Sequence, residues 1–307
     1  MLISGARTTN QNKNFKPLFI GFGKQALEYA RVLKSLNIKI NSVCISNLKR
    51  NKNNLRKYEI VHIYQDIRRA ISEKKYNCVF IFLPWYLIEK KIIYILKNTN
   101  KRIFCEKPIA LSLKSLSKIN KLSNRYNKKL YILYNRRYYN IHFFLKKKIN
   151  KNSSIKAFIP EKINLKLKKI DKKLKGKIKY HLTSHWIDFF TSVTNKKIIK
   201  VKKNKNLYIF SLSGKKNLIT VAPNFPGKIT AEFKSNNYIY RLNSLENLQV
   251  IDLKKNKIIK KIDEFGYNKF KPGVLNLIKS VISNKKILLP ETKDLINLYK
   301  ALSTLPF

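Results

Sequence analysis

The first 134 residues show a hydrophobic pattern that predicts a parallel β-sheet with crossover helices. Short apolar runs, typical of buried strands, alternate with stretches in which apolar residues recur every three or four positions. Ser112 precedes the last of these stretches as an N-cap. A doubly wound sheet of this kind places ligands at the carboxyl ends of its strands. The predicted strands are 18–20, 38–45, 60–63, 79–83, 102–105 and 130–133, and the predicted helices are 25–36, 66–73, 87–97 and 113–126.

The pattern changes after a helix that begins near Tyr139. A lysine-rich segment follows, then one apolar helix at 186–193, and then short alternating segments that predict a mostly antiparallel sheet. We therefore expect a doubly wound α/β domain over 15–134 and an α+β domain over 135–307, whose C-terminal helices pack back. The strands expected here are 198–202, 207–212, 218–222, 229–233, 238–242, 248–253 and 258–262, and the closing helices are 274–283 and 292–303.

Length and composition indicate a globular protein of the cytoplasm. With 307 residues and 44% hydrophobic content, the chain can bury the cores of two domains. No apolar run is long enough to span a bilayer, and the polar N-terminal stretch lacks the apolar region of a secretory signal. Cys44, Cys78 and Cys105 each lie in an apolar stretch, as reduced core thiols do.

The formal net charge of +51 favours contact with nucleic acids, anionic lipids or acidic substrates. The lysines are spread over both halves, however, and accompany abundant Asn, Ile, Tyr and Phe, which is the bias that AT-rich codons produce. No helix-turn-helix motif and no paired Cys/His spacing occurs. We therefore interpret the charge mainly as solvated surface, keep nucleic-acid binding as a lower alternative, and expect no catalytic metal.

The first predicted strand runs into a glycine loop that fits the G-x-G-x-x-G/A dinucleotide fingerprint. The loop reads Gly21-Phe22-Gly23-Lys24-Gln25-Ala26 and opens directly into an amphipathic helix. Gly21 permits the tight turn, Gly23 lets the backbone approach a pyrophosphate, and Ala26 allows close packing of helix on strand. The free N–H groups of the helix N-terminus suit the anion. The alternative is an ordinary strand-to-helix turn.

The second part of the fingerprint, an acidic residue about twenty positions further on, is missing. Ser46 and Asn47 occupy that place, and Lys49 and Arg50 follow. Cations at this point neutralise a 2′-phosphate, which tilts the choice of cofactor slightly toward NADP over NAD. Because lysine and arginine occur nearly everywhere in the chain, both cofactors remain open.

After the fifth predicted strand comes Cys105-Glu106-Lys107-Pro108, and with it the chain resembles the glucose-fructose oxidoreductase / inositol dehydrogenase / MocA family, whose hallmark is E-K-P behind a Rossmann glycine loop. Three further motifs occur in the family's order: Leu83-Pro84, Tyr134-Asn135-Arg136-Arg137-Tyr138 and Ser184-His185-Trp186-Ile187-Asp188. The wording is closest to members associated with surface-polysaccharide sugar metabolism, an analogy that implies a sugar-like substrate.

The resemblance implies a role for each matching residue. Lys107 and His185 would be catalytic, with His185 as acid/base, because removing a hydride from a carbinol also requires its hydroxyl proton to leave. Arg136, His181 and Asp188 would contact substrate, although a role of Asp188 in orienting its helix is equally open. Members of the family commonly pair through the open sheet of the second domain, so a homo-oligomer is expected. The cofactor would contact Gly21, Phe22, Gly23, Lys24, Gln25, Ser46, Leu83, Pro84, Glu106, Pro108 and Asn135.

Some positions depart from the family pattern. His181 stands where many relatives carry an aspartate four residues before the catalytic histidine, and Leu83, Trp85 and Ile88 replace the usual polar residues. Three hypotheses follow: an NAD(P)-dependent dehydrogenase or reductase acting on a sugar, sugar derivative or polyol; a family member that has lost turnover and binds a cofactor or a partner; and a basic nucleic-acid binder.

Overall fold

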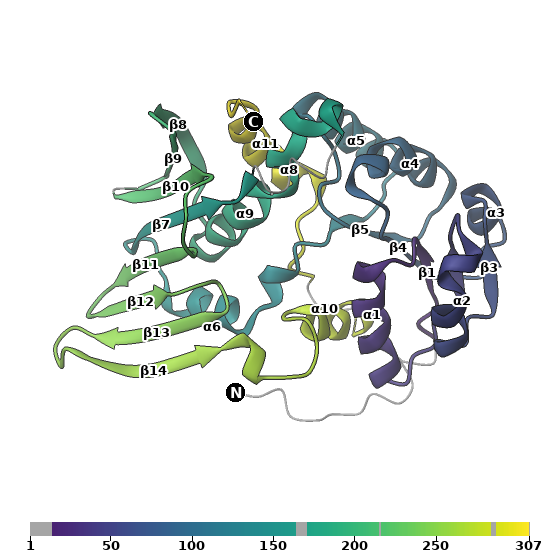
Figure 1. The fold of residues 1–307 in the computed structure, drawn as a ribbon, viewed down its shortest axis with the longest axis horizontal. Coiled ribbons are helices and arrows are strands. Elements are labelled where there is room, and N and C mark those ends of the chain that lie inside the picture. The colour runs from purple at the N-terminus through teal and green to yellow at the C-terminus, as the bar shows by residue number, and fades with distance from the viewer. Residues whose placement is uncertain (1–13, 164–170, 215, 284–286, 307) are drawn as a thin grey trace.

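The computed structural model describes residues 14–163, 171–214, 216–283 and 287–306. They form two sheets with helices between and around them (Figure 1). Sheet A, with six strands, comes from the N-terminal half of the chain, and sheet B, with eight, comes from the C-terminal half.

Sheet A is parallel throughout and has the strand order β3-β2-β1-β4-β5-β6. This is the order of the doubly wound fold, whose ligand crevice opens where the order reverses between β1 and β4. The expectation of a doubly wound parallel sheet is therefore confirmed. Its elements are β1 (Pro17–Ile20), α1 (Lys24–Ser35), β2 (Ser42–Cys44), α2 (Leu48–Lys57), β3 (His62–Tyr64), α3 (Ile67–Ser72), β4 (Cys78–Ile81), α4 (Trp85–Asn98), β5 (Arg102–Cys105), α5 (Leu113–Arg125) and β6 (Leu130–Ile132).

Ser112 is the N-cap of α5, since its hydroxyl accepts from the backbone N–H of Ser115 at 3.0 Å. Helix α2, in contrast, falls on a stretch for which we predicted no helix. Only Leu55 of that helix is buried, so it has almost no apolar face for the pattern to reveal, and the side chain of Asn47 caps its start.

Sheet B has the order β14-β13-β12-β11-β7-β10-β9-β8, and only β7 and β10 run parallel. The mostly antiparallel second sheet is thus confirmed. Its strands are β7 (Ser154–Glu161), β8 (Ile198–Asn204), β9 (Leu207–Leu212), β10 (Asn217–Pro223), β11 (Thr230–Ser235), β12 (Tyr238–Leu242), β13 (Asn247–Asp252) and β14 (Lys257–Asp263). The accompanying helices are η1 (Asn135–Tyr138), α6 (Asn140–Lys148), η2 (Lys172–Lys177), α8 (Ile178–His181), α9 (Thr183–Thr194), η3 (Glu264–Gly266), α10 (Val274–Ile282), η4 (Thr292–Leu295) and α11 (Ile296–Ser303).

Strand β7 was not predicted, and it lies in the middle of sheet B between β11 and β10. Its side chains alternate, with Ile155, Ala157, Ile159 and Glu161 on the buried face. The strand is difficult to predict because of Pro160, since a proline inside a run of strand-forming residues argues against a central strand. The structure tolerates it next to the last residue of the strand.

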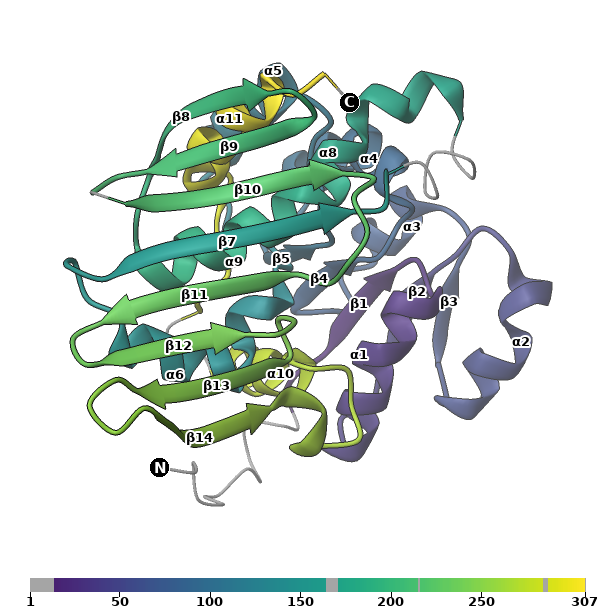
Figure 2. The same ribbon diagram turned by 60° about the vertical axis from the view of Figure 1, so that its left-hand side comes forward.

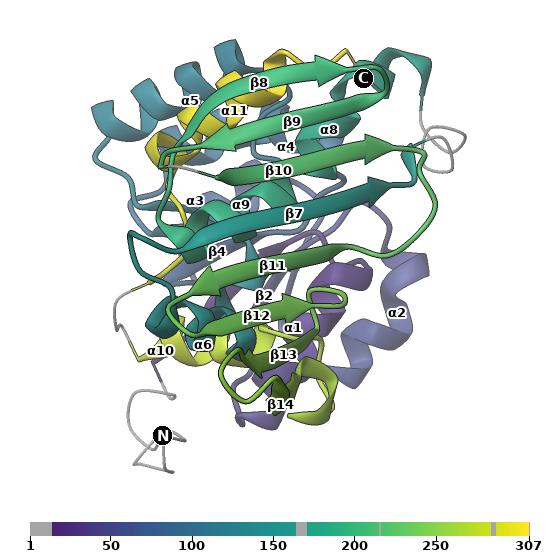
Figure 3. The same ribbon diagram turned by 90° about the vertical axis from the view of Figure 1, so that its left-hand side faces the viewer.

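The helices lie on one face of sheet B, and no described helix covers the other (Figures 2 and 3). One hydrophobic core runs from sheet A through these helices to sheet B, and it includes Ile103 of β5, Phe190 of α9 and Phe233 of β11. The C-terminal helices pack back, α10 on α1 and α11 on α5 and α9. The C-terminal half of the chain therefore packs against helices of the N-terminal half.

All three cysteines are buried free thiols in or at the end of strands of sheet A. Within the described ranges, no helix combines the length and the apolar character that crossing a membrane requires.

Candidate active site

The loop between β1 and α1 contains two glycines, and a side chain at each would meet different surroundings. Gly21 has a φ of +91°, and a Cβ there would lie 2.7 Å from the carbonyl oxygen of Phe82. Gly23 meets nothing within 4 Å of the position of its missing Cβ. Gly21 is therefore required by the fold, whereas the open space over Gly23 suits a bound group that approaches the backbone.

The other loop residues point in different directions. The Phe22 ring is buried against Tyr58, so only its backbone faces the loop, and Lys24 is exposed. Gln25 accepts a hydrogen bond from Lys271 Nζ at 2.8 Å. Ser46 is exposed at the carboxyl end of β2. These positions follow the carboxyl edge of sheet A, where a dinucleotide binds in doubly wound folds.

Leu83 and Pro84 follow β4 at the same edge, where Pro84 is the N-cap of α4. Leu83 is half-buried and Pro84 is exposed. Asn135, in contrast, is buried, and its side-chain amide donates to the carbonyl of Pro272 at 3.0 Å. Its side chain therefore ties η1 to the segment before α10.

Glu106, Lys107 and Pro108 form the turn after β5. The backbone N–H of Glu106 donates to the carbonyl of Ile81 at 2.9 Å, and the bond before Pro108 is cis. Oε1 of Glu106 is buried without a hydrogen-bond partner. Burial raises the pKa of this carboxyl, and the charges of Lys271 and Lys107 oppose the shift.

Lys107 reaches from this turn to the C-terminal half of the chain. Its Nζ donates to the carbonyl of His181 at 2.5 Å. Burial lowers the pKa of Lys107 to about 7; the Glu106 carboxylate opposes this shift, while the Arg136 guanidinium adds to it. An amine that titrates near neutrality can exchange a proton at physiological pH.

His185 lies in the first turn of α9, one turn after His181. Its Nδ1 is buried without a hydrogen-bond partner, and its ring lies 5.7 Å from that of Tyr134. Burial lowers the pKa of His185 well below its ordinary value, and the charges of Arg136 and Lys107 act in the same direction. The imidazole is therefore neutral at pH 7, which is the form that accepts a proton.

His181 and Trp85, two of the positions that depart from the family pattern, pack against each other. Their rings stack with centroids 5.3 Å apart and an interplanar angle of 11°. Trp85 begins α4 and His181 ends α8. The stack therefore joins the two halves of the molecule beside Lys107.

Arg136 lies on η1, and its guanidinium carbon sits 3.4 Å from the ring centroid of Trp186. Its Nε and Nη1 are buried without hydrogen-bond partners. Two buried N–H donors that no described residue satisfies are costly, unless a ligand takes them. This residue is thus suited to hold a polar group of a substrate.

Asp188 is 2% exposed, and Arg137 holds both of its carboxylate oxygens. The distances are 2.6 Å from Nη2 to Oδ1 and 3.0 Å from Nε to Oδ2. Arg137 also donates to the carbonyl of Leu288 at 3.1 Å. Of the two roles expected for Asp188, this geometry favours orienting α9 over contacting a substrate, because no oxygen is left facing open space.

Glu161, at the end of β7, was not singled out from the sequence. It is 3% exposed; its Oε2 accepts from the Thr183 hydroxyl at 2.6 Å, and its Oε1 is buried without a partner. Burial raises its pKa to about 7, against the effects of the Thr183 hydroxyl and of the Lys107 charge. Glu161 thus places a carboxyl near enough to Lys107 for the two charges to interact. Recognising β7 as a strand could have revealed it.

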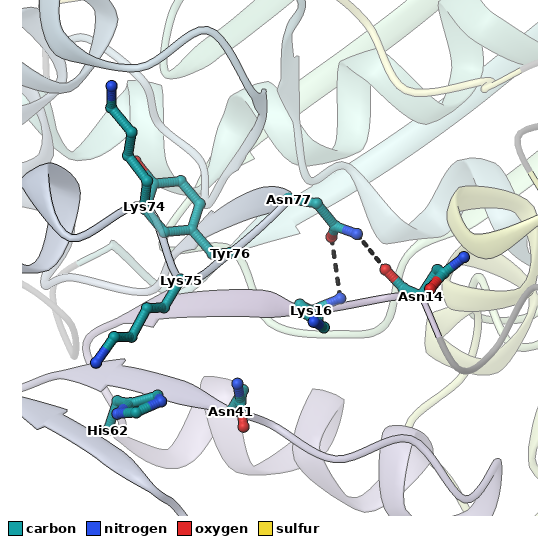
Figure 4. Close-up of a pocket in the computed structure, with 8 residues that line it drawn as sticks. All are labelled: Asn14, Lys16, Asn41, His62, Lys74, Lys75, Tyr76 and Asn77. Atoms are coloured by element: carbon teal, nitrogen blue, oxygen red, sulfur yellow. Dashed lines mark hydrogen bonds between the residues drawn. The ribbon is translucent and has the colours of Figure 1, made fainter.

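A surface cavity of about 460 Å³ lies at the opposite, amino edge of sheet A (Figure 4). His62, Lys74, Lys75 and Tyr76 are among the residues that line it. Ligands of doubly wound sheets bind at the carboxyl ends, so this cavity is separate from the candidate site. Within the part of the chain that the structure describes, no three His, Cys, Asp or Glu side chains gather as metal ligands.

A doubly wound sheet with a glycine phosphate loop, facing a second sheet that is open on one side, defines a class of two-domain dinucleotide-binding folds. The family model described as "Oxidoreductase family, NAD-binding Rossmann fold" (GFO_IDH_MocA) matches residues 15–134. Residues 15–134 therefore match the NAD-binding Rossmann domain of this oxidoreductase family, and the likeness of fold to solved structures extends over the remainder of the chain.

Solved structures show this extended likeness. The super-repressor mutant of Gal80p from Saccharomyces cerevisiae has a TM-score of 0.76 and 13% sequence identity, with 94% of each chain covered. The myo-inositol 2-dehydrogenase of Lactobacillus plantarum has a TM-score of 0.70 and 17% identity, with 94% of this chain and 95% of the other covered. At such identities the likeness concerns the fold.

A curated relative, the 2,7-anhydro-N-acetylneuraminate hydratase of Escherichia coli (strain K12), is 30% identical over 93 residues. The match covers 30% of this chain and 24% of the hydratase. It therefore spans about a quarter of that relative's length.

Proposed function

We propose that the protein is an NAD(P)-dependent oxidoreductase that moves a hydride between a nicotinamide and a hydroxyl-bearing carbon of a sugar, sugar derivative or polyol. One observation carries the proposal: Lys107, which follows β5, and His185, in the first turn of α9, belong to one buried group at the carboxyl edge that also holds the glycine loop. The names of two similar proteins, an inositol dehydrogenase and a neuraminate-derivative hydratase, fit a sugar-like substrate.

The glycine loop fits a dinucleotide. Gly23 leaves open space, and the N-terminus of α1 offers free N–H groups for a pyrophosphate. Glu106 and Pro108, after β5, would face the nicotinamide riboside, and Ser46, after β2, the adenosine ribose. When bound, the nicotinamide supplies or accepts the hydride.

The protein's own groups handle the proton. On oxidation the carbinol C–H bond breaks with its electron pair, and the O–H proton passes to the neutral His185. The ammonium of Lys107 would stabilise the developing charge on the oxygen. Arg136 would donate to a neighbouring oxygen of the substrate, and Glu161 would accept from a neighbouring hydroxyl.

We also propose a preference for NADP. Lys49 and Arg50 are exposed in the first turn of α2, shortly after Ser46 and Asn47. A 2′-phosphate on the adenosine ribose would lie near these cations, and the acidic residue that would repel it is absent.

The experiment is a search for turnover with NAD⁺ and NADP⁺ against a panel of inositols, aldoses and sugar acids, followed by absorbance of the reduced nicotinamide. Turnover that is lost in Lys107→Ala supports the proposal. Tight cofactor binding without turnover on any panel member would support a second candidate, a cofactor-binding or partner-binding member without catalysis. The Trp85–His181 stack at the departing positions favours that candidate, as does the likeness of fold to a repressor.

A further inference from the structure

Lys271 joins the C-terminal half of the chain to the glycine loop. It lies between η3 and α10, and its Nζ donates to Gln25 Oε1 at 2.8 Å across 246 positions of sequence. Gln25 is the second residue of α1 and comes two positions after Gly23. The hydrogen bond therefore holds the ammonium at the first turn of α1, next in sequence to the loop that contains Gly23.

The backbone around Lys271 is held in place. The carbonyl of Pro272 accepts from the Asn135 amide at 3.0 Å, and the carbonyl of Lys271 accepts from the N–H of Val274 at 3.2 Å. Gly273 has a φ of +79°, and a Cβ there would lie 2.3 Å from the carbonyl oxygen of Asn135. The segment is thus packed directly on η1, and α10, which follows it, packs on α1.

No ion pair among the described residues compensates the positive charge of Lys271. Burial lowers its pKa; the Glu106 carboxylate opposes the shift, and Arg136 adds to it. Burial raises the pKa of Glu106, and the charges of Lys271 and Lys107 oppose that shift. Within the described residues no carboxylate forms an ion pair with Lys271, and Gln25 takes only one of its three N–H donors.

We propose that Lys271 binds the pyrophosphate of the dinucleotide, so that the cofactor is held by both halves of the molecule. The inference rests on the proposed dinucleotide binding and adds to it a cation from outside the glycine fingerprint. An ammonium at the N-terminus of α1 complements the backbone N–H groups of the loop, because both offer positive charge to the same anion. Cofactor binding then also fixes the C-terminal half against sheet A.

The test uses NADH fluorescence to measure affinity in the wild type and in three variants. Lys271→Gln removes the charge, Lys271→Arg keeps it, and Lys269→Gln removes an exposed lysine two positions earlier. We expect Lys271→Gln to weaken NADH binding about tenfold, the effect of losing one charge-assisted hydrogen bond. Lys271→Arg and Lys269→Gln should stay within about twofold of the wild type.

A second measurement needs no variant. The wild type is acetylated with and without saturating NADH, and the modification of each lysine is followed by mass spectrometry. NADH should protect Lys271 and leave Lys269 unprotected. Unchanged affinity in Lys271→Gln, or unchanged acetylation of Lys271, overturns the inference while dinucleotide binding stands. Absence of NADH and NADPH binding in the wild type removes the proposed function itself, and the inference with it.

Discussion

At the scale of single residues, burial shifts the pKa values of several ionisable groups in the site away from their ordinary values. Lys107 and Glu161 both have a pKa of about 7, although one is a base and the other an acid, and His185 is held neutral. Perturbed groups of this kind cluster at functional sites. The motifs in the sequence singled out Lys107 and His185 as candidates. Glu161 was not singled out, because β7 was not recognised as a strand of sheet B.

The roles of Lys107 and His185 predict non-additive losses of turnover. Each single alanine variant should lose on the order of a hundredfold in turnover, and the double variant should be little worse than the poorer single one, since both act on the same proton and charge. NADH affinity should stay nearly intact in all three. Steady-state rates with the best substrate of the panel provide the measurement, and multiplicative losses would contradict the shared role.

Glu161 predicts a pH-dependent effect on stability. Its pKa is about 7 in the folded chain against an ordinary 4.5, so the folded state holds the extra proton between these values. The free energy of unfolding therefore falls as pH rises from 4.5 to 7, by up to about 3 kcal/mol. Glu161→Gln cannot titrate and should gain on the wild type from pH 5 to pH 8.

Urea unfolding at both pH values measures this gain. Glu232→Gln, on β11 outside the site, is the matched control and should change by the same amount at pH 5 and pH 8. If Glu161→Gln also differs from the wild type equally at both values, Glu161 is not the buried acid described above.

At the scale of elements, hydrophobic periodicity predicted most of the helices and strands. It failed where few residues of an element are buried or where a proline interrupts the pattern. It located all seven of the other strands of sheet B near their observed positions, and β9 to β13 have the expected alternation of buried and less buried side chains. It missed α2, of which only Leu55 is buried, and β7, which contains Pro160. As a result, the sequence analysis singled out neither Glu161 on β7 nor the helix that carries Lys49.

The loop between β1 and α1 predicts opposite results for its two glycines. Gly23→Val should weaken NADH binding at least about tenfold and leave the fold intact, because the side chain enters space that a pyrophosphate needs. Gly21→Ala should lower the free energy of unfolding by roughly 1–3 kcal/mol, since the new Cβ meets the Phe82 carbonyl.

NADH titration and urea unfolding of both variants separate these effects. Gly176→Val serves as the control for an added side chain. A Cβ at Gly176 would also meet nothing within 4 Å, but this residue lies in η2. Full NADH affinity in Gly23→Val would mean that the loop is only a structural turn.

The start of α2 predicts the choice of cofactor. Replacing Lys49 and Arg50 together by alanine should reduce NADPH affinity more than NADH affinity, because only NADPH has a 2′-phosphate to neutralise. Replacing Lys52 and Arg56, further along α2, together by alanine is the matched control. Equal losses for the two cofactors would refute the preference for NADP.

At the scale of the whole molecule, the two sheets share one core, and the C-terminal helices return to sheet A. The composition predicted a globular chain but could not show that Lys271 reaches Gln25, a contact between residues 246 positions apart. We propose self-association through the face of sheet B that no described helix covers, which sedimentation velocity would test. The net charge of +51 keeps nucleic-acid binding as the alternative to be excluded.

Fluorescence titration of the wild-type protein with NADPH and NADH, at about 0.15 M salt and with duplex DNA as a competing ligand, tests the central claim most directly. We predict saturable binding of a nicotinamide dinucleotide that DNA does not displace and that Gly23→Val abolishes or strongly weakens. A protein that binds neither NADPH nor NADH, but retains duplex DNA at this salt concentration, would contradict the account.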